Sequence, residues 1–289
     1  MNSSLEQHAS VSLERQSLRS IRSFHLVTAD LCRLVGFYRD VLGFGVVGPA
    51  RPIDQDEMAL LGIRGSGTRQ VLALGAQSVA VESFDAAGRP YPPSVDAASL
   101  RFQHLALVVD DIAASYAQLR EVAPISLEGP QRLPPASGGA KAFKFRDPDG
   151  HPLELIEFSA AKKPFVWRAL AAQPGQIAIG IDHSAISVSD LGASVRFYEG
   201  LGLAAEQGTV NVGPAQENLD CLQNVRVSVK PMRPAGGTSH LELLGYERSR
   251  SDGACGLRPN DVAATRICWD GDRAALLVDP DGHLQQVAH

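Results

Sequence analysis

The sequence lacks the features that mark membrane-spanning, secreted and nucleic-acid-binding proteins. Only four of its 289 residues are cysteines and none form a CxxC pair, which argues against a cysteine zinc motif. No run of about 18 apolar residues occurs, and residues 1–20 are polar and charged, so neither a membrane span nor a signal peptide is expected. A formal net charge of −5 disfavours nucleic acid or an anionic membrane as the main partner. The expected location is the cytoplasm.

What is present is the composition of an ordinary globular protein, with 44% hydrophobic and 20% charged residues. The length suits two domains and allows a core large enough to fold without a disulfide or a structural metal.

The chain repeats itself. Three segments begin with an apolar stretch that contains a histidine, and an amphipathic helical pattern follows each one. The histidines are His25, His104 and His183, and each is 79 positions from the next. A further step ends at Val262, beside the strand-like segment 264–270, which indicates a fourth, degenerate copy.

A second repeat marks the ends of copies two and four. Asp-Pro-Asp-Gly-His occurs at 147–151 and again at 279–283, each time between apolar segments. Proline presets one backbone angle and glycine accepts a positive φ, so both segments predict a tight β-hairpin turn.

Each full copy therefore predicts a strand, a helix and about three further strands. The fourth copy is too short to hold the helix. The predicted organisation is a loose arm over 1–20, an N-terminal pair of modules over 21–161 and a degenerate C-terminal pair over 176–289.

These motifs resemble the vicinal oxygen chelate superfamily, which includes glyoxalases, extradiol ring-cleaving dioxygenases and bleomycin-binding proteins. The resemblance implies an α+β fold of four βαβββ modules, the fourth truncated, in two paired cup-shaped halves. It also implies that metal ligands come from the first and last strands of paired modules. Such folds host many reactions, so the scaffold alone does not name the chemistry.

Carried onto this chain, the resemblance predicts a metal site of His25, His104 and Glu154 in the N-terminal pair. The corresponding last-strand position of the first module aligns with Ala80. Two imidazoles and one carboxylate, with an open position opposite, are typical of non-heme Fe(II), although Zn, Mn, Ni or Co would also bind such a set.

The first functional hypothesis is thus an Fe(II) extradiol-type dioxygenase that acts on a small catechol-like substrate. A glyoxalase-type lyase or isomerase with a redox-inert metal is the second, and Ala80 counts against it because such enzymes use four protein ligands. The third is a drug- or metabolite-binding protein without turnover. The expected partner is a small molecule, and a homodimer would form if a second copy covered a sheet edge left by the short fourth module.

Further candidates follow from position. His151 and Tyr91 are candidates for acid–base catalysis, since one lies on the turn beside Glu154 and the other in the linker after the first module. Candidates for contact with a substrate are the ligand-like residues outside the triad: His183, Glu242, Gln285 and Glu82.

Overall fold

The computed structural model describes residues 16–119, 122–248 and 256–289. Most of the predicted loose arm, residues 1–15, lies outside the described residues. Its last part is not loose, because Leu18 is buried and its backbone N–H donates to the carbonyl of Leu201 at 2.8 Å. No helix in the described ranges is long and apolar enough to cross a membrane.

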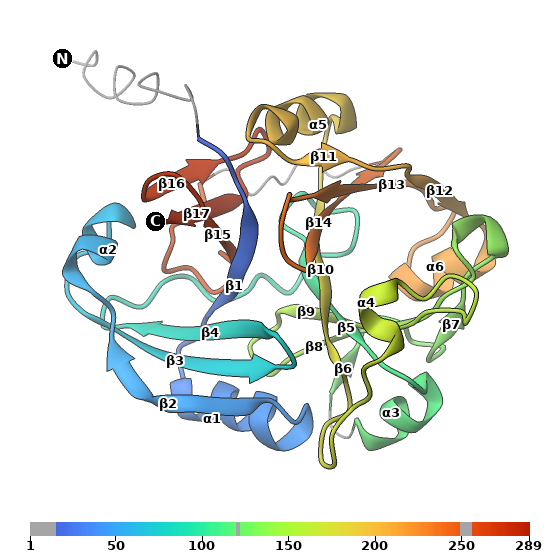
Figure 1. Cartoon of the computed structure of the whole chain (residues 1–289), viewed down its shortest axis with the longest axis horizontal. Coiled ribbons are helices and arrows are strands. Elements are labelled where there is room, and N and C mark those ends of the chain that lie inside the picture. Colours follow the sequence, from blue (N-terminus) through green and yellow to red (C-terminus); the bar gives the residue numbers. More distant parts are fainter. Residues whose placement is uncertain (1–15, 120–121, 249–255) are drawn as a thin grey trace.

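The fold is α+β, as predicted, and the four modules follow one another around the molecule (Figure 1). The first module contains β1 (Ser20–Val27), α1 (Leu31–Gly36), η1 (Phe37–Val41), β2 (Gly45–Pro52), α2 (Gln55–Leu60), β3 (Gly67–Leu74) and β4 (Gln77–Phe84). The second contains β5 (Gln103–Val108), α3 (Ile112–Gln118), β6 (Ala123–Pro124), β7 (Gln131–Arg132), η2 (Pro135–Ser137), β8 (Lys141–Arg146) and β9 (Pro152–Glu157).

A linker with the short helix α4 (Phe165–Arg168) leads to the second half of the chain. The third module contains β10 (Gly180–Ser187), α5 (Leu191–Gly200), β11 (Ala204–Ala205), β12 (Thr209–Val212), α6 (Pro214–Asp220), β13 (Arg226–Arg233) and β14 (His240–Tyr246). The fourth is reduced to β15 (Arg266–Asp270), β16 (Ala275–Val278) and β17 (Leu284–Ala288), and its described residues contain no helix, as the sequence predicts.

An aspartate begins the first helix of each full module. The side chains of Asp30, Asp111 and Asp190 accept hydrogen bonds from backbone N–H groups in the first turns of α1, α3 and α5. Such capping satisfies donors that the helix itself leaves free. Each cap fixes where the first strand ends and the helix begins, so it also gives a common origin for comparing positions between modules.

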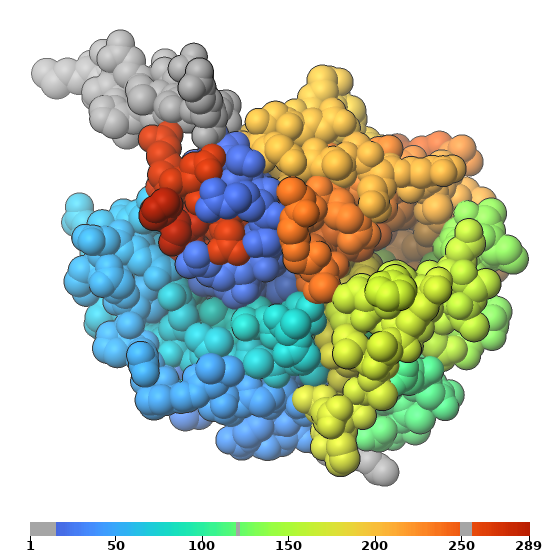
Figure 2. Space-filling view, viewed as in Figure 1, coloured from blue at the N-terminus to red at the C-terminus, as the bar shows by residue number. Residues whose placement is uncertain are grey.

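The modules pair in an order that the sequence analysis did not predict. One sheet runs β16-β17-β15-β1-β4-β3-β2 and joins modules one and four, whereas the other joins modules two and three through β5 and β10. Figure 2 shows the same arrangement on the surface, with the red C-terminal module beside the blue N-terminal strand. The prediction that modules one and two share a sheet, and modules three and four another, is therefore wrong. The two halves of the fold are an outer pair and an inner pair of modules.

Modules that follow each other in sequence contact through a helix and a turn. The hydroxyl of Tyr38 on η1 lies 3.3 Å from Oδ2 of Asp147, in the turn of module two. In the same way, the hydroxyl of Tyr198 on α5 donates to Asp279 in module four at 3.0 Å. Both tyrosines are fully buried. These repeated contacts hold the two sheets together through the shared hydrophobic core.

Candidate metal centre

Two antiparallel strands at the centre of the inner sheet, β5 and β10, bring four potential ligands together. The last strand of each module runs parallel to its first strand, so that Ala106 lies beside Glu154 and Ala185 beside Glu242. Side chains two residues apart on a strand share a face. His104, Glu154, His183 and Glu242 therefore all reach one cavity of ≈ 250 Å³.

The ligand atoms are close enough to share one ion. Nε2 of His104 lies 3.0 Å from Oε2 of Glu154, and Nε2 of His183 lies 3.5 Å from Oε2 of Glu242. One ligand atom each from His104, Glu154 and His183 falls within 4.8 Å of the other two. Glu242 completes the set at the edge of this group.

The hydrogen bonding of His104 also points to a metal. It is buried, yet within the described residues neither of its ring nitrogens has a partner in hydrogen-bonding geometry, even though Glu154 is so near. Buried polar atoms without partners are rare and costly. An ion bound between Nε2 of His104 and the carboxylate of Glu154 would give each of these groups a partner, so the residues present fit a divalent metal.

The electrostatics of the site favour ionised carboxylates. Burial opposes their charge, but His104 and Lys144 more than offset it and lower the pKa of Glu154 to about 2. Burial lowers the pKa of His104 itself, which favours its neutral form. Burial also acts on His183, but Glu242 and Asp182 outweigh it and raise the pKa of His183 to about 9.

A second group of residues fixes the orientation of His183. Its Nδ1 donates to Oδ2 of Asp182 at 3.0 Å, which leaves Nε2 facing the cavity. The other oxygen of Asp182 accepts a hydrogen bond of 2.7 Å from the indole of Trp167, on α4. A carboxylate behind a metal-binding imidazole fixes its tautomer and its direction.

Lys144 lies beside the ligands on β8. Its Nζ is 2.6 Å from Oδ1 of Asp220 and 3.9 Å from Oε2 of Glu154, and its side chain is buried. Burial disfavours the ammonium form, but Asp220 and Glu154 outweigh this and raise the pKa of Lys144. The cavity therefore contains a permanent positive charge beside the candidate metal position.

The predicted triad of His25, His104 and Glu154 is not formed. His104 and Glu154 come together as predicted, but His25 lies on β1 in the other sheet and lines a different cavity. His183, which was expected only to contact a substrate, lies in its place. The reason is the pairing of modules, since β10 and not β1 lies beside β5.

The sequence did contain a signal against His25. His104 and His183 each lie seven residues before the aspartate that caps the next helix, whereas His25 lies only five before Asp30. Ser23 is the residue at the seven-residue position of module one. The regular spacing of 79 residues between the histidines concealed this shift of two.

The remaining candidates lie elsewhere. His151 is locked in its turn by Asp147 and by the carbonyl of Val262, and neither it nor Tyr91 lines the cavity with His104. Glu82 belongs to the outer sheet with His25. Gln285 points to the opposite face, where its amide bonds Trp269 and Tyr198. The residue of module four that corresponds to Glu154 is Gln286, because each is the third residue after the turn histidine.

Comparison with known proteins agrees with this architecture. The family model described as "Glyoxalase/Bleomycin resistance protein/Dioxygenase superfamily" matches residues 20–155. The structure is similar to glyoxalase I from Zea mays, with a TM-score of 0.56 and 17% identity over 94% of this chain and 92% of that one. It is also similar to a Bacillus subtilis protein named "putative dioxygenase", with a TM-score of 0.57 and 12% identity over 95% and 86% of the two chains. No curated protein sequence matches the chain at a significant level.

At these identities the solved structures show a shared fold and no more. The family model supplies the sequence evidence over modules one and two, and the repeated modules extend the same architecture through the rest of the chain. Residues 20–155 therefore match the glyoxalase, bleomycin resistance protein and dioxygenase superfamily, and the chain as a whole shares the fold of these solved structures.

Proposed function

We propose that this protein is a metal-dependent lyase or isomerase of the glyoxalase type, acting on a small substrate with two adjacent oxygens. The observation that carries the proposal is the complete set of four donors, His104, Glu154, His183 and Glu242, around one cavity. The missing ligand at Ala80 counted against this function only while module one was assigned to the site. With modules two and three paired, no ligand position lacks a donor.

A divalent metal held by these residues would act as a Lewis acid toward the substrate oxygens. Lys144 contributes a cation that attracts a negatively charged substrate oxygen on the same side of the cavity. Glu242 is the more exposed of the two carboxylates, with 18% of its side chain accessible against 8% for Glu154. Burial opposes its charge, but His183 outweighs this and lowers the pKa of Glu242, so the carboxylate is ionised and accessible to accept a proton from a substrate carbon.

A second candidate, the Fe(II) dioxygenase, has one observation in its favour. The three donors that lie closest together, His104, Glu154 and His183, are two imidazoles and a carboxylate. This is the facial set that non-heme Fe(II) oxygenases use, with open positions for substrate and dioxygen. The dioxygenase requires that Glu242 stay off the metal, whereas the lyase or isomerase uses it as the fourth donor.

The experiment that tests the proposal is metal analysis of protein purified without oxygen. We expect about one divalent metal per chain in the wild type and its loss in His104→Ala and in His183→Ala. His25→Ala is the matched control, because it removes a buried histidine of the other sheet and should keep the metal. Loss of metal in His25→Ala with retention in His183→Ala would contradict the proposed ligands.

Metal identity and oxygen dependence then separate the two reactions. Zinc, nickel, manganese or cobalt, with oxygen-independent isomerisation of α-hydroxy carbonyl compounds, would support the lyase or isomerase. Iron with oxygen uptake on catechols would support the dioxygenase. Protein that binds no metal even after reconstitution would overturn both and leave a small-molecule binding protein.

A further inference from the structure

The outer sheet encloses a second cavity, of ≈ 660 Å³, on the face that corresponds to the metal centre. Its walls come from β1, β3, β4, β15 and β17, together with α2 and the C-terminal residue. It is more than twice as large as the cavity of the inner sheet. The metal-dependent function assigns it no role.

The four ligand positions of this cup carry no metal-binding set. The serine at the seven-residue position is Ser23, and the last-strand position of module one is Ala80, which lies beside His25 as Glu242 lies beside Ala185. In module four the positions hold Arg266 and Gln286. A fully buried guanidinium thus replaces an imidazole, and it donates to both Gln286 and Glu82.

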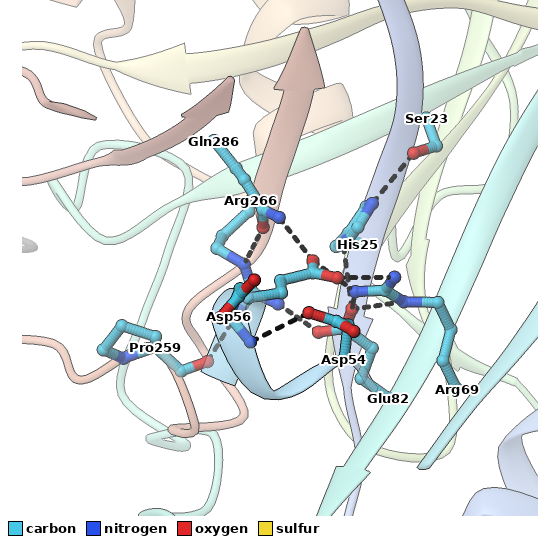
Figure 3. Close-up of polar contacts among 10 residues, drawn as sticks. Ser23, His25, Asp54, Asp56, Arg69, Glu82, Pro259, Arg266 and Gln286 are labelled. Carbon is cyan, nitrogen blue, oxygen red and sulfur yellow. Dashed lines mark hydrogen bonds and ion pairs between the residues drawn. The ribbon is translucent and has the colours of Figure 1, made fainter. Parts of the chain in front are cut away.

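Ser23, His25 and Glu82 form a linear chain of hydrogen bonds in this cup (Figure 3). Oγ of Ser23 lies 2.8 Å from Nε2 of His25, and Nδ1 of His25 lies 2.9 Å from Oε1 of Glu82. We propose that these residues are a Ser–His–Glu catalytic triad, and that the outer cup hydrolyses small carboxylic esters independently of the metal centre. Nucleophile, base and orienting carboxylate within hydrogen-bond reach are the geometry that such catalysis needs.

The protonation of His25 suits the role of a base. A carboxylate only accepts hydrogen bonds, so Nδ1 carries the proton toward Glu82 and Nε2 presents its lone pair to the hydroxyl of Ser23. Burial lowers the pKa of His25; Glu82 opposes this shift, and the cations of Arg69 and Arg266 add to it. The imidazole is therefore neutral at pH 7 and able to take a proton.

Two arginines hold the carboxylate of Glu82 in place. Nε of Arg69 donates to Oε1 at 2.8 Å, and Arg266 donates to Oε2 from the opposite side. Arg69 is anchored in turn by Glu57 on α2, at 3.0 Å from Nη1. These guanidinium contacts occupy Glu57 and Glu82, which otherwise approach His25 closely enough to form a metal cluster. Because arginines already hold both carboxylates, the site fits a hydrogen-bonded catalytic triad better than a metal site.

The strand geometry presents the serine and the histidine together. They are two residues apart on β1, so both face the cavity, and the pairing of β1 with β15 shifts register immediately before Ser23. Such bulges re-aim side chains next to active sites. β10 has the same shift immediately before His183, so the two cups place a different functional residue at one common position.

The proposed step is acyl transfer to serine and then to water. Oγ of Ser23 attacks the ester carbonyl carbon as its proton passes to Nε2 of His25. The bond from that carbon to the alkoxy oxygen then breaks, and His25 returns the proton to the leaving alcohol. Water, activated by the same nitrogen, hydrolyses the acyl-serine to a carboxylic acid and restores the hydroxyl. Arg22 lines the same cavity as Ser23, with its Nε held by Asp270 at 2.6 Å.

The test uses the full chain, p-nitrophenyl butyrate and a fluorophosphonate probe. We expect ester hydrolysis and probe attachment at Ser23, located by peptide mass spectrometry. Ser23→Ala should lower kcat/KM at least roughly 100-fold and abolish labelling, since losing the nucleophile of a triad removes most of its catalysis. Ser78→Ala is the matched control, because Ser78 lines the same cavity without a histidine partner among the bonds found in the described residues.

Two further variants separate this proposal from the metal-dependent function. His104→Ala, which removes a candidate metal ligand, should keep both ester hydrolysis and labelling of Ser23. His25→Gln should lose both and still show the circular dichroism of the wild type. Hydrolysis that survives in Ser23→Ala, labelling at another residue, or neither hydrolysis nor labelling in the wild type would overturn the proposal.

Discussion

At the residue scale, one position on the first strand of each module distinguishes the two cups. The residue seven before the capping aspartate is histidine in modules two and three and serine in module one. In the inner cup the two histidines face two glutamates and leave room for an ion. In the outer cup Arg266 takes the place of a ligand, and it donates hydrogen bonds to Gln286 and Glu82 on the same backbone framework.

Asp182 should control how tightly the inner cup binds its metal. It holds His183 through Nδ1 and is itself held by Trp167. Asp182→Asn removes the charge and keeps the shape, and we expect metal affinity to fall about 10- to 100-fold. Competition with a fluorescent chelator measures the change. Asp54→Asn, at the cap of α2 in the outer half, is the control, and equal affinities in the two variants would contradict the role of Asp182.

Part of the candidate metal centre could be predicted from the sequence. His104 and Glu154 were predicted as ligands from their family motif, and His183 and Glu242 were predicted only to contact a substrate. The assignment failed at His25 because even spacing along the chain was given more weight than distance from the helix cap. Spacing reports the length of a module, whereas the cap fixes the register of a strand, and register decides which face a side chain occupies.

At the scale of elements, the Asp-Pro-Asp-Gly-His turn between β8 and β9 joins the two halves of the fold. Asp147 accepts hydrogen bonds from the backbone of Asp149 and His151 and from the ring of His151. The other ring nitrogen of His151 lies 2.9 Å from the carbonyl of Val262, just before module four. Both nitrogens face acceptors, so the doubly protonated ring fits this place.

This turn should make stability depend on pH. Burial lowers the pKa of His151, but Asp147 outweighs it and the pKa is raised overall. A raised folded-state pKa gives stability that is complete below the unfolded value of about 6.5 and is lost as pH rises through the folded value. Urea unfolding should therefore show His151→Gln costing about 1–3 kcal/mol at pH 6 and less at pH 9. A cost independent of pH would show that the ring is neutral in the folded protein.

The elements that the sequence predicted best are those with repeated motifs. The first strands, the capped helices and the two hairpin turns all lie where the pattern placed them. The helices α2 and α6 were not predicted, because each has only six or seven residues and offers less than two full turns of periodicity. They matter nonetheless, since residues of α2 line the outer cavity and residues of α6 line the inner one.

At the scale of the whole molecule, the outer pair of modules encloses the inner pair in the order of the chain. β1 lies between β4 of its own module and β15 of the last one (Figure 1). The inner cup is encoded by one continuous stretch, from β5 to β14, whereas the outer cup combines modules from both sides of that stretch. The linkers 85–102 and 158–179 are both long enough for either pairing, so chain connectivity could not reveal which first strands would meet.

Because modules one and four form one sheet and modules two and three the other, the behaviour of fragments can be predicted. A fragment of residues 1–161 keeps β1 without β15 and β5 without β10, so each of these two largely buried strands loses one of its two neighbours. We expect it to be insoluble or unfolded alone and to form a folded complex when co-expressed with 162–289. Circular dichroism and size exclusion measure both outcomes. A stable, monomeric 1–161 fragment would contradict the observed pairing of the sheets.

The position of β1 between β4 and β15 also affects the order in which the two sheets can form during protein synthesis. One neighbour, β4, is made soon after β1, but the other, β15, follows only after modules two and three, on the order of ten seconds or more later at ordinary translation rates. The inner pair is complete once β14 has left the ribosome. The metal centre can therefore assemble before the outer cup is complete, while the edge of β1 that faces β15 is still unpaired.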